Sequence, residues 1–253
     1  MKAALLALAF AGPAIAADPA DAGACVAPAF AMQVLQAARG DDGQALDLNR
    51  TEAVEQTQAP IPGHEDICAY VAAWIELVEG GQRLAHLYFA TYQKETGAKR
   101  ADLHVKVDVE NLGTWAPTPV IDPVRFDLRP DAASFAVRLT TLMGKMQTYN
   151  GVETDFRLIV DDGQAALKNV FTDIADIYEQ KIDDDSQAAR QEPLQAETLY
   201  IVDPAAHRGF HDLIKQVSLR ARRTNGTLGP RTKTTRTRFQ YDGQEYAEAR
   251  PAH

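Results

Sequence analysis

The stretch DPAAHRGFHDLIKQVSLRARR, from Asp203 to Arg223, carries the strongest periodic pattern in the chain and decides the fold prediction. On a helix, its apolar side chains would share one face, at Phe210, Leu213, Ile214, Val217 and Ala221. Asp203 is a suitable N-cap residue, and Pro204 suits the first helical position. We therefore predict an amphipathic helix from 204 to about 223.

The side of this predicted helix opposite to its apolar face is basic. It carries Arg208, His211, Lys215 and Arg222, with Arg223 near its edge. The strand-like segment RTKTTRTRFQY follows at 231–241 and turns at Asp242-Gly243. Strand alternation places Arg231 and Lys233 on one face and Arg236 and Arg238 on the other. We predict a ligand-binding surface made of Arg208, His211, Lys215, Arg222, Arg223, Arg236 and Arg238.

Charge patterning also supports internal pairing of these residues. Residues 153–197 hold twelve acidic and four basic residues, a net charge of −8. Residues 208–238 hold nine basic residues and one acidic residue, a net charge of +8. Neighbouring blocks of equal and opposite charge favour contacts within the chain as readily as a site for an anionic partner.

A metal site is a further candidate in the same stretch, because His207 and His211 lie one helical turn apart. Arg208 follows His207, so the general-base Glu of an HExxH helix is absent. The chain has three serines, none of them in a GxSxG or SxxK pattern. It also lacks phosphate-binding glycine loops and a CxxCH haem motif, so we predict no cofactor and no catalytic residue.

The N-terminus has the pattern of a secretory signal peptide. Lys2 precedes an apolar run, and the small residues AIA at 14–16 form a cleavage site, so we assign residues 1–17 to the signal. The protein is therefore expected in the periplasm or outside the cell. In such an oxidising compartment, Cys25 and Cys68, which are the two cysteines of the chain, are expected to pair.

The rest of the chain divides into two parts. Residues 18–63 are expected to form an extension with one short helix at 29–39 and loop thereafter, tied to the body by the disulfide. Residues 64–253 are expected to form one α+β domain. A stretch of at least 18 apolar residues is absent from the chain after the signal, so no transmembrane segment is predicted. The formal net charge of −9 argues against specific nucleic-acid binding.

Within that domain we predict a largely antiparallel sheet with two or three amphipathic helices packed on it. Leu103, Val105 and Val107 alternate with polar residues, as in a half-buried strand. Further strands are predicted at 123–130, 154–163 and 197–203, and a hairpin around Gly80-Gly81 whose first arm also fits a helix. Residues 131–147 fit either type. A second helix is predicted over 165–181 from the apolar spacing of Leu167, Val170, Phe171, Ile174 and Ile177.

Taken together, the sequence favours a secreted, non-catalytic protein that binds an anionic envelope component or another protein through a basic helix-plus-strand surface. One alternative is a metal-dependent or carboxylate-based secreted hydrolase, with His207 and His211 as the best candidate residues. A second alternative is a structural envelope protein whose charges pair internally.

Overall fold

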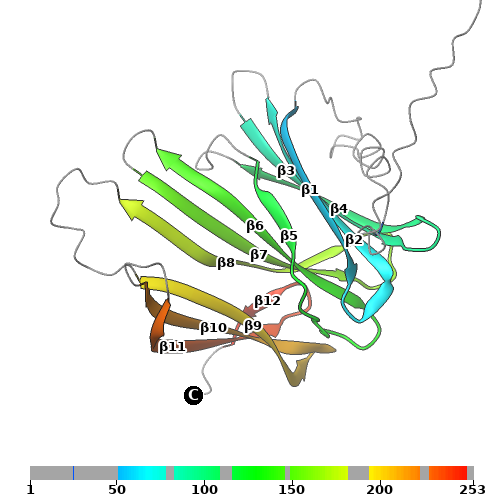
Figure 1. Cartoon of the computed structure of the whole chain (residues 1–253). Coiled ribbons are helices and arrows are strands. Elements are labelled where there is room, and N and C mark those ends of the chain that lie inside the picture. Colours follow the sequence, from blue (N-terminus) through cyan, green and yellow to red (C-terminus); the bar gives the residue numbers. More distant parts are fainter. Residues whose placement is uncertain are drawn as a thin grey trace, which may run out of the picture.

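The structure is a computed structural model that describes residue 25 and residues 51–77, 83–108, 116–145, 149–181, 194–222 and 228–249. Within these ranges the chain forms strands and no helix (Figure 1), so the predicted α+β class is wrong and the fold is all-β. The helix predicted at 29–39 lies outside the described ranges. The strands are β1 (Thr51–Ile61), β2 (His64–Leu77), β3 (Arg83–Gln93), β4 (Lys99–Asp108), β5 (Thr118–Ile121), β6 (Ala133–Lys145), β7 (Tyr149–Asp161), β8 (Lys168–Lys181), β9 (Leu194–His207), β10 (Phe210–Arg222), β11 (Leu228–Tyr241) and β12 (Tyr246–Glu248).

The strands form three antiparallel sheets of four strands each, and every pair of hydrogen-bonded neighbours is also consecutive in the sequence. We call β1–β4 the first sheet, β5–β8 the middle sheet and β9–β12 the last sheet. Figure 1 shows them as three layers, with the middle sheet between the other two. This order brings segments close in the sequence together and requires no crossover connection.

The middle sheet is apolar on both faces, which explains the three layers. On β6, Phe135 and Val137 point into a core shared with the first sheet, and Ala136 points into a core shared with the last sheet. β7 behaves in the same way, because Ile159 joins the first core and Leu158 joins the second. Because both faces of this sheet are apolar, another layer must cover each of them to remove the apolar side chains from contact with water.

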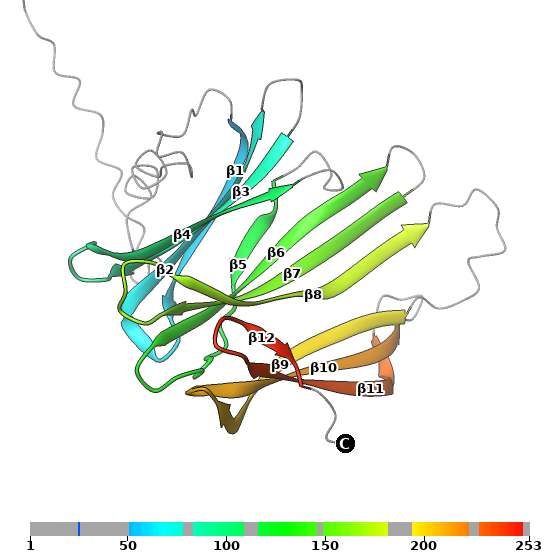
Figure 2. The same cartoon turned by 180° about the vertical axis from the view of Figure 1, so that it is seen from behind.

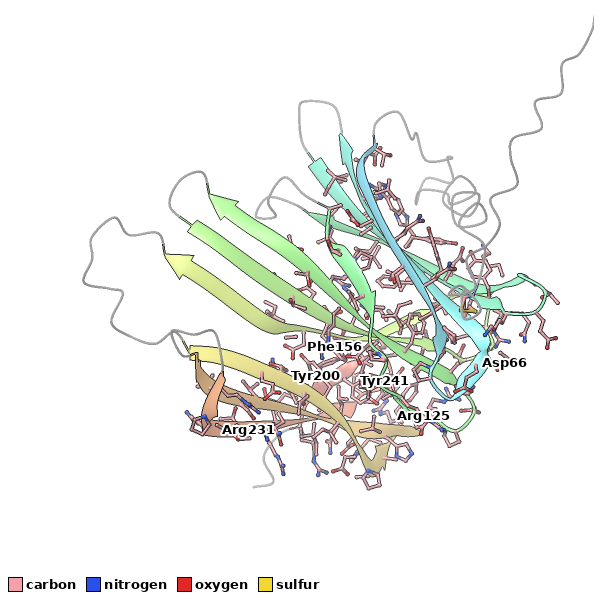
Figure 3. All side chains as sticks on the ribbon, in the orientation of Figure 1. Asp66, Arg125, Phe156, Tyr200, Arg231 and Tyr241 are labelled. Atoms are coloured by element: carbon pink, nitrogen blue, oxygen red, sulfur yellow. A yellow bond between two sulfur atoms is a disulfide. The ribbon has the colours of Figure 1, made fainter. Side chains whose placement is uncertain are left out.

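Aromatic side chains fill the second core, between the middle and last sheets. Phe156 of β7 stacks on Tyr200 of β9, with ring centroids 3.8 Å apart, and Phe210 stacks on Tyr241 at 3.9 Å. Figure 3 shows Phe156, Tyr200 and Tyr241 in this layer. All four side chains are buried, so they contribute large apolar areas to the packing of the last sheet on the middle one.

The helix predicted over 165–181 is replaced by β8, and β-bulges explain the error. The β7–β8 register skips Val170 between the pairs Ile159–Asn169 and Leu158–Phe171. It skips a second residue, Ala175, further along the strand. Each extra residue breaks the two-residue alternation of a strand. The apolar residues therefore recur at spacings of three and four, which imitates a helix.

The helix predicted over 204–223 is also wrong, because this stretch is the hairpin of β9 and β10. Its loop consists of Arg208 and Gly209, which have φ angles of 51° and 83°. Positive φ at both residues of a two-residue loop is the requirement of a type I′ turn. The β9–β10 register shifts between the pairs His211–Ala206 and Asp212–Asp203. Phe210 and Leu213, which lie on either side of this shift and three residues apart, both belong to the second core.

Other expectations meet mixed outcomes. β4, β7 and β9 confirm the strands predicted around 103–109, 154–163 and 197–203, and β11–β12 confirm the turn at Asp242-Gly243. β2 and β6 resolve their helix-or-strand ambiguities as strands. β1 lies where loop was predicted.

The strand predicted over 123–130 is wrong, because this segment is irregular. Phe126 and Leu128 are buried there, as alternation implied. The backbone nevertheless joins no sheet, and the carbonyl of Leu128 accepts a hydrogen bond from the amide of His211 (2.9 Å). Burial of alternate residues therefore indicates an extended backbone, but it does not indicate that the backbone pairs with a neighbouring strand.

The predicted disulfide is confirmed. Cys25 and Cys68 are bonded, with their Cα atoms 5.5 Å apart. Both cysteines are buried, and Cys68 belongs to β2 in the first sheet. The bond therefore fixes Cys25 to that sheet.

Two edge strands, β4 of the first sheet and β8 of the middle sheet, start together and then diverge (Figure 2). A single parallel bridge joins Asp102 to Ala166. It is flanked by hydrogen bonds from the Asp102 amide to the Ala165 carbonyl (3.3 Å) and from the Leu167 amide to the Asp102 carbonyl (3.0 Å). Among the described residues, pairing between the two strands goes no further, so the first and middle sheets separate along this line.

Candidate functional site

The described members of the predicted basic surface lie on different faces of the last sheet. Arg208 lies in the β9–β10 turn, beside Gly243 of the β11–β12 turn. Lys215 points to the opposite side of the last sheet, toward the middle sheet, where its Nζ lies 2.7 Å from Asp173. Arg236 and Arg238 point to the outer face of the last sheet. Of the remaining predicted residues, Arg222 is the last residue of β10, and Arg223 lies outside the described residues.

The described cations on the outer face of the last sheet have partners within the chain. Arg238 contacts Asp203 (3.0 Å) and the buried Asp212 (3.4 Å). Arg236 donates a hydrogen bond to Gln216 (2.8 Å). Arg220 and Arg231 both contact Glu197, at 3.1 and 3.4 Å.

Several of these ion pairs join the acidic and basic blocks of the sequence. Asp173 and Glu197 come from the acidic block, and Lys215, Arg220 and Arg231 come from the basic one. The face alternation predicted for Arg231 is wrong, because the β10–β11 register skips Thr232 and brings Arg231 opposite Arg220. Figure 3 shows Arg231 on the last sheet. Internal pairing therefore accounts for much of the positive charge.

The two candidate metal ligands have other partners. His207 Nδ1 lies 2.5 Å from Asp212 Oδ1, and its Nε2 lies 3.1 Å from the side-chain amide of Gln240. His211 Nδ1 lies 3.1 Å from the carbonyl oxygen of Pro204. A search of the described residues finds no group of three His, Cys, Asp or Glu side chains placed to hold a metal ion. Their position in a hairpin also removes the helical spacing that suggested the site.

Two histidines that nothing in the sequence places together do meet in the first sheet. His86 Nδ1 lies 2.9 Å from His104 Nε2, and His86 Nε2 lies 2.8 Å from Glu76 Oε2. Both rings stack with Trp74, at centroid distances of 5.0 and 5.6 Å. His86 and Trp74 are each 1% exposed, so this cluster is part of the packing of the sheet.

An unusual polar residue of the described chain is Arg157, on β7. It pairs with Val137 of β6, which belongs to the core shared with the first sheet. On its other side it pairs with Thr172 of β8. Directly opposed residues of an antiparallel ladder share a face, so Arg157 points toward the first sheet. It lies near the diverging edge, next to the last strand of the middle sheet.

Arg157 is buried, and its Nε atom has no hydrogen-bond partner among the described residues. The residue is 8% exposed. Its Nη2 lies 3.9 Å from Asp155 Oδ2, which is too far for a hydrogen bond. Burial lowers the pKa of Arg157, and the Asp155 carboxylate acts in the opposite direction. A buried cation with unused donors is unfavourable unless something else satisfies it.

Two carboxylates accompany Arg157 on the same face of β7. Asp155 pairs with Leu139 and Glu153 pairs with Thr141, so both side chains also point toward the first sheet. Burial raises the pKa of Asp155; Arg157 opposes this shift, and Asp173 adds to it. Burial and the neighbouring Asp155 raise the pKa of Glu153. The positive charge of Arg157 therefore lies on the same face as two partly buried acids.

Apolar side chains of β4 and β8 point into the same space between the first and middle sheets as this polar group. Leu103, Val105 and Val107 of β4 pack on the core shared with the middle sheet but are only partly buried. Ile174 of β8 pairs with Asp155, points toward the first sheet and is 44% exposed. These four side chains are therefore partly exposed on a stretch where no described pairing joins β4 to β8. We call Leu103, Val105, Val107, Asp155, Arg157 and Ile174 the β4–β8 seam.

Comparison of the chain with protein-family models, with curated proteins and with solved structures found no match. None of the described segments forms a helix of the length and hydropathy needed to cross a membrane. Inference about function therefore rests on the chemistry of the site itself.

The β4–β8 seam differs from the basic surface and the histidine pair that the sequence predicts. Arg157 lies in the predicted strand TDFRLIVDDG, between Phe156 and Leu158. The available signal is a single arginine in a strand whose neighbours on both sides are large and apolar. Such a strand is buried on both faces, so a charged residue within it is buried as well.

Proposed function

We propose that this protein is a non-catalytic binding protein whose ligand carries an anionic group held by Arg157 in the β4–β8 seam. The observation that carries this proposal is the buried Arg157 side chain, whose Nε lacks a hydrogen-bond partner among the described residues. A guanidinium presents five donors in a planar fork that matches a carboxylate or phosphate group. An anion bound to the guanidinium would give Arg157 an acceptor that the described residues do not supply.

We also propose that the protein acts in the periplasm or outside the cell. The signal-like residues 1–17 and the Cys25–Cys68 disulfide support an oxidising compartment. The outer face of the last sheet is a weaker candidate for anion binding. Its described cations, such as Arg238, already contact carboxylates of the chain.

Thermal unfolding with added anions tests the proposal. The native protein and Arg157→Gln are each heated with phosphate, sulfate, acetate or octanoate. Arg125→Gln is the matched control, because it removes an arginine that is exposed and paired with Asp127 (2.7 Å). We expect at least one anion to raise the Tm of the native protein and of the control but not of Arg157→Gln. At a hundredfold excess over the Kd, the stabilisation would be about 2.7 kcal/mol.

Equal shifts in the native protein and in Arg157→Gln would show that anions bind elsewhere and would overturn the assignment. Loss of the shift in Arg125→Gln as well would indicate a general effect of charge. Circular dichroism of each variant at low temperature checks that its strands are intact.

A further inference from the structure

We infer that the ligand of the β4–β8 seam is a monoanionic amphiphile: one carboxylate on a hydrocarbon chain. This inference rests on the proposed function and names the chemical class of the ligand. It follows from two features of the seam. The first is its charge, and the second is its group of four aliphatic side chains, here called the apolar wall: Leu103, Val105, Val107 and Ile174.

The charge favours a single negative charge on the ligand. Arg157 is flanked on its own strand by Asp155 and Glu153, whose side chains share its face. The closer of these, Asp155, has an oxygen 3.9 Å from the guanidinium. A dianion such as a phosphate monoester would meet two carboxylates for one cation. A monoanion leaves much less repulsion.

The wall favours a hydrocarbon chain. Leu103, Val105 and Val107 lie on alternate positions of β4 and all point toward the middle sheet. Over this length the strand extends about 13 Å. Ile174, on the opposite side and beside Asp155, is 44% exposed although it points between two sheets. A chain bound with its carboxylate on Arg157 would cover these side chains.

The same geometry argues against a purely polar anion. The seam offers one described cation and four aliphatic side chains. A small ion would gain one charge-assisted contact and would leave the four aliphatic side chains exposed to water. Each methylene buried against the wall strengthens binding by about fourfold. Affinity should therefore increase along a series of carboxylates until the wall is covered.

Calorimetric titration with acetate, butyrate, octanoate and dodecanoate tests this inference. Octylammonium and octyl phosphate are the comparison ligands. We expect affinity to rise by about threefold to fourfold per methylene over the middle of the series. Octanoate should bind more tightly than octyl phosphate at neutral pH, and octylammonium should bind at least about tenfold more weakly.

Three variants separate the contributions. Arg157→Gln should weaken octanoate and acetate alike. Ile174→Thr should lower the gain from chain length and leave acetate unchanged. Val120→Thr is the matched control, because Val120 is 49% exposed on β5 and pairs with Arg138, on the face of the middle sheet that Arg157 does not share. It should bind like the native protein.

The outcomes distinguish this inference from the proposed function. Binding that depends on Arg157 but does not change with chain length would overturn the amphiphile and leave the proposed function intact. Tighter binding of octyl phosphate than of octanoate would overturn the single negative charge. Binding that strengthens with the length of the hydrocarbon chain, persists in Arg157→Gln and extends to octylammonium would overturn both the inference and the proposed function. Failure of every carboxylate to bind would overturn the inference, and the phosphate and sulfate arms above would then decide the proposed function.

Discussion

Replacement of Arg157 by Met in the ligand-free protein should not destabilise the fold, and should stabilise it by about 1 kcal/mol. Methionine keeps the length of the apolar stem and removes the guanidinium. An unsatisfied buried polar group costs about 1–3 kcal/mol, and Arg157 Nε is such a group among the described residues. The one described ion pair that would be lost, to Asp155, is 3.9 Å long, and the Asp155 side chain is 31% exposed. Such a pair is worth about 0–1 kcal/mol.

The assay is urea unfolding, followed by the fluorescence of tryptophan, since Trp74 is 1% exposed and should report loss of the first sheet. The midpoint should rise with no change in the slope m. In thermal unfolding, 1 kcal/mol corresponds to about 2–4 °C for a chain of this size.

A matched control is Lys215→Met, which removes a partly buried cation that does have partners. Lys215 contacts Asp173 (2.7 Å) and donates to the carbonyl of Ile174 (3.1 Å). We expect this change to lower the free energy of unfolding by about 3 kcal/mol, because it leaves the Asp173 carboxylate without its cation. A loss of about 3 kcal/mol or more in Arg157→Met as well would refute the reasoning. It would mean that Arg157 holds the fold together and is not kept for a ligand.

Three further predictions follow from local features. Replacing Cys25 and Cys68 by Ser should lower the free energy of unfolding in urea by about 4 kcal/mol, because the bond closes a long loop of the unfolded chain. Arg208→Asn should raise it by about 0.5–1 kcal/mol, since asparagine tolerates the positive φ of 51° better than arginine. Asp155→Asn should raise it at neutral pH, with an advantage that shrinks on acidification, because burial raises the pKa of Asp155 in the folded state.

The sign of the pH effect follows from the folded-state pKa. The native protein bears the cost of the charged, partly buried Asp155 fully above that raised pKa and loses this cost below the unfolded-state pKa. An advantage of Asp155→Asn that grew on acidification would contradict the prediction. For the disulfide, added reductant should destabilise the native protein and leave the double serine variant unchanged. Arg208→Ala, which does not favour positive φ, is the control for the turn and should not stabilise the protein.

The sequence predicted a strand where apolar and polar residues alternate without interruption, as in β4, and failed in β8, where the strand is irregular. Leu103, Val105 and Val107 alternate without interruption, so β4 was recognisable. In β8, the bulges at Val170 and Ala175 change which residues share a face, and the spacing then resembles a helix. A bulge depends on the partner strand, so the sequence of β8 alone does not reveal it.

The site was even less predictable, because its character depends on layers that form from distant segments. Arg157 is an ordinary strand residue until the first sheet covers its face of β7. Lys215 shows the opposite case: its charge was counted as part of a free surface, but the packing of the last sheet places it against Asp173. Net charge along the sequence described the blocks correctly and could not say which members meet.

The two-sided burial of the middle sheet has a consequence for strand alignment. In a sheet with one wet face, a slip by one residue turns apolar side chains to water, and this penalty fixes the register. β7 lacks that protection, since both of its faces are covered. The buried Asp161 of β7 can fix the register in place of this penalty. Its carboxylate accepts hydrogen bonds from Thr91 (2.8 Å) and Arg100 (2.9 Å) in the first sheet. A one-residue slip would turn Asp161 toward the aromatic layer around Phe156, where those donors are absent. A buried charge thus marks the correct alignment that hydrophobicity alone would leave ambiguous.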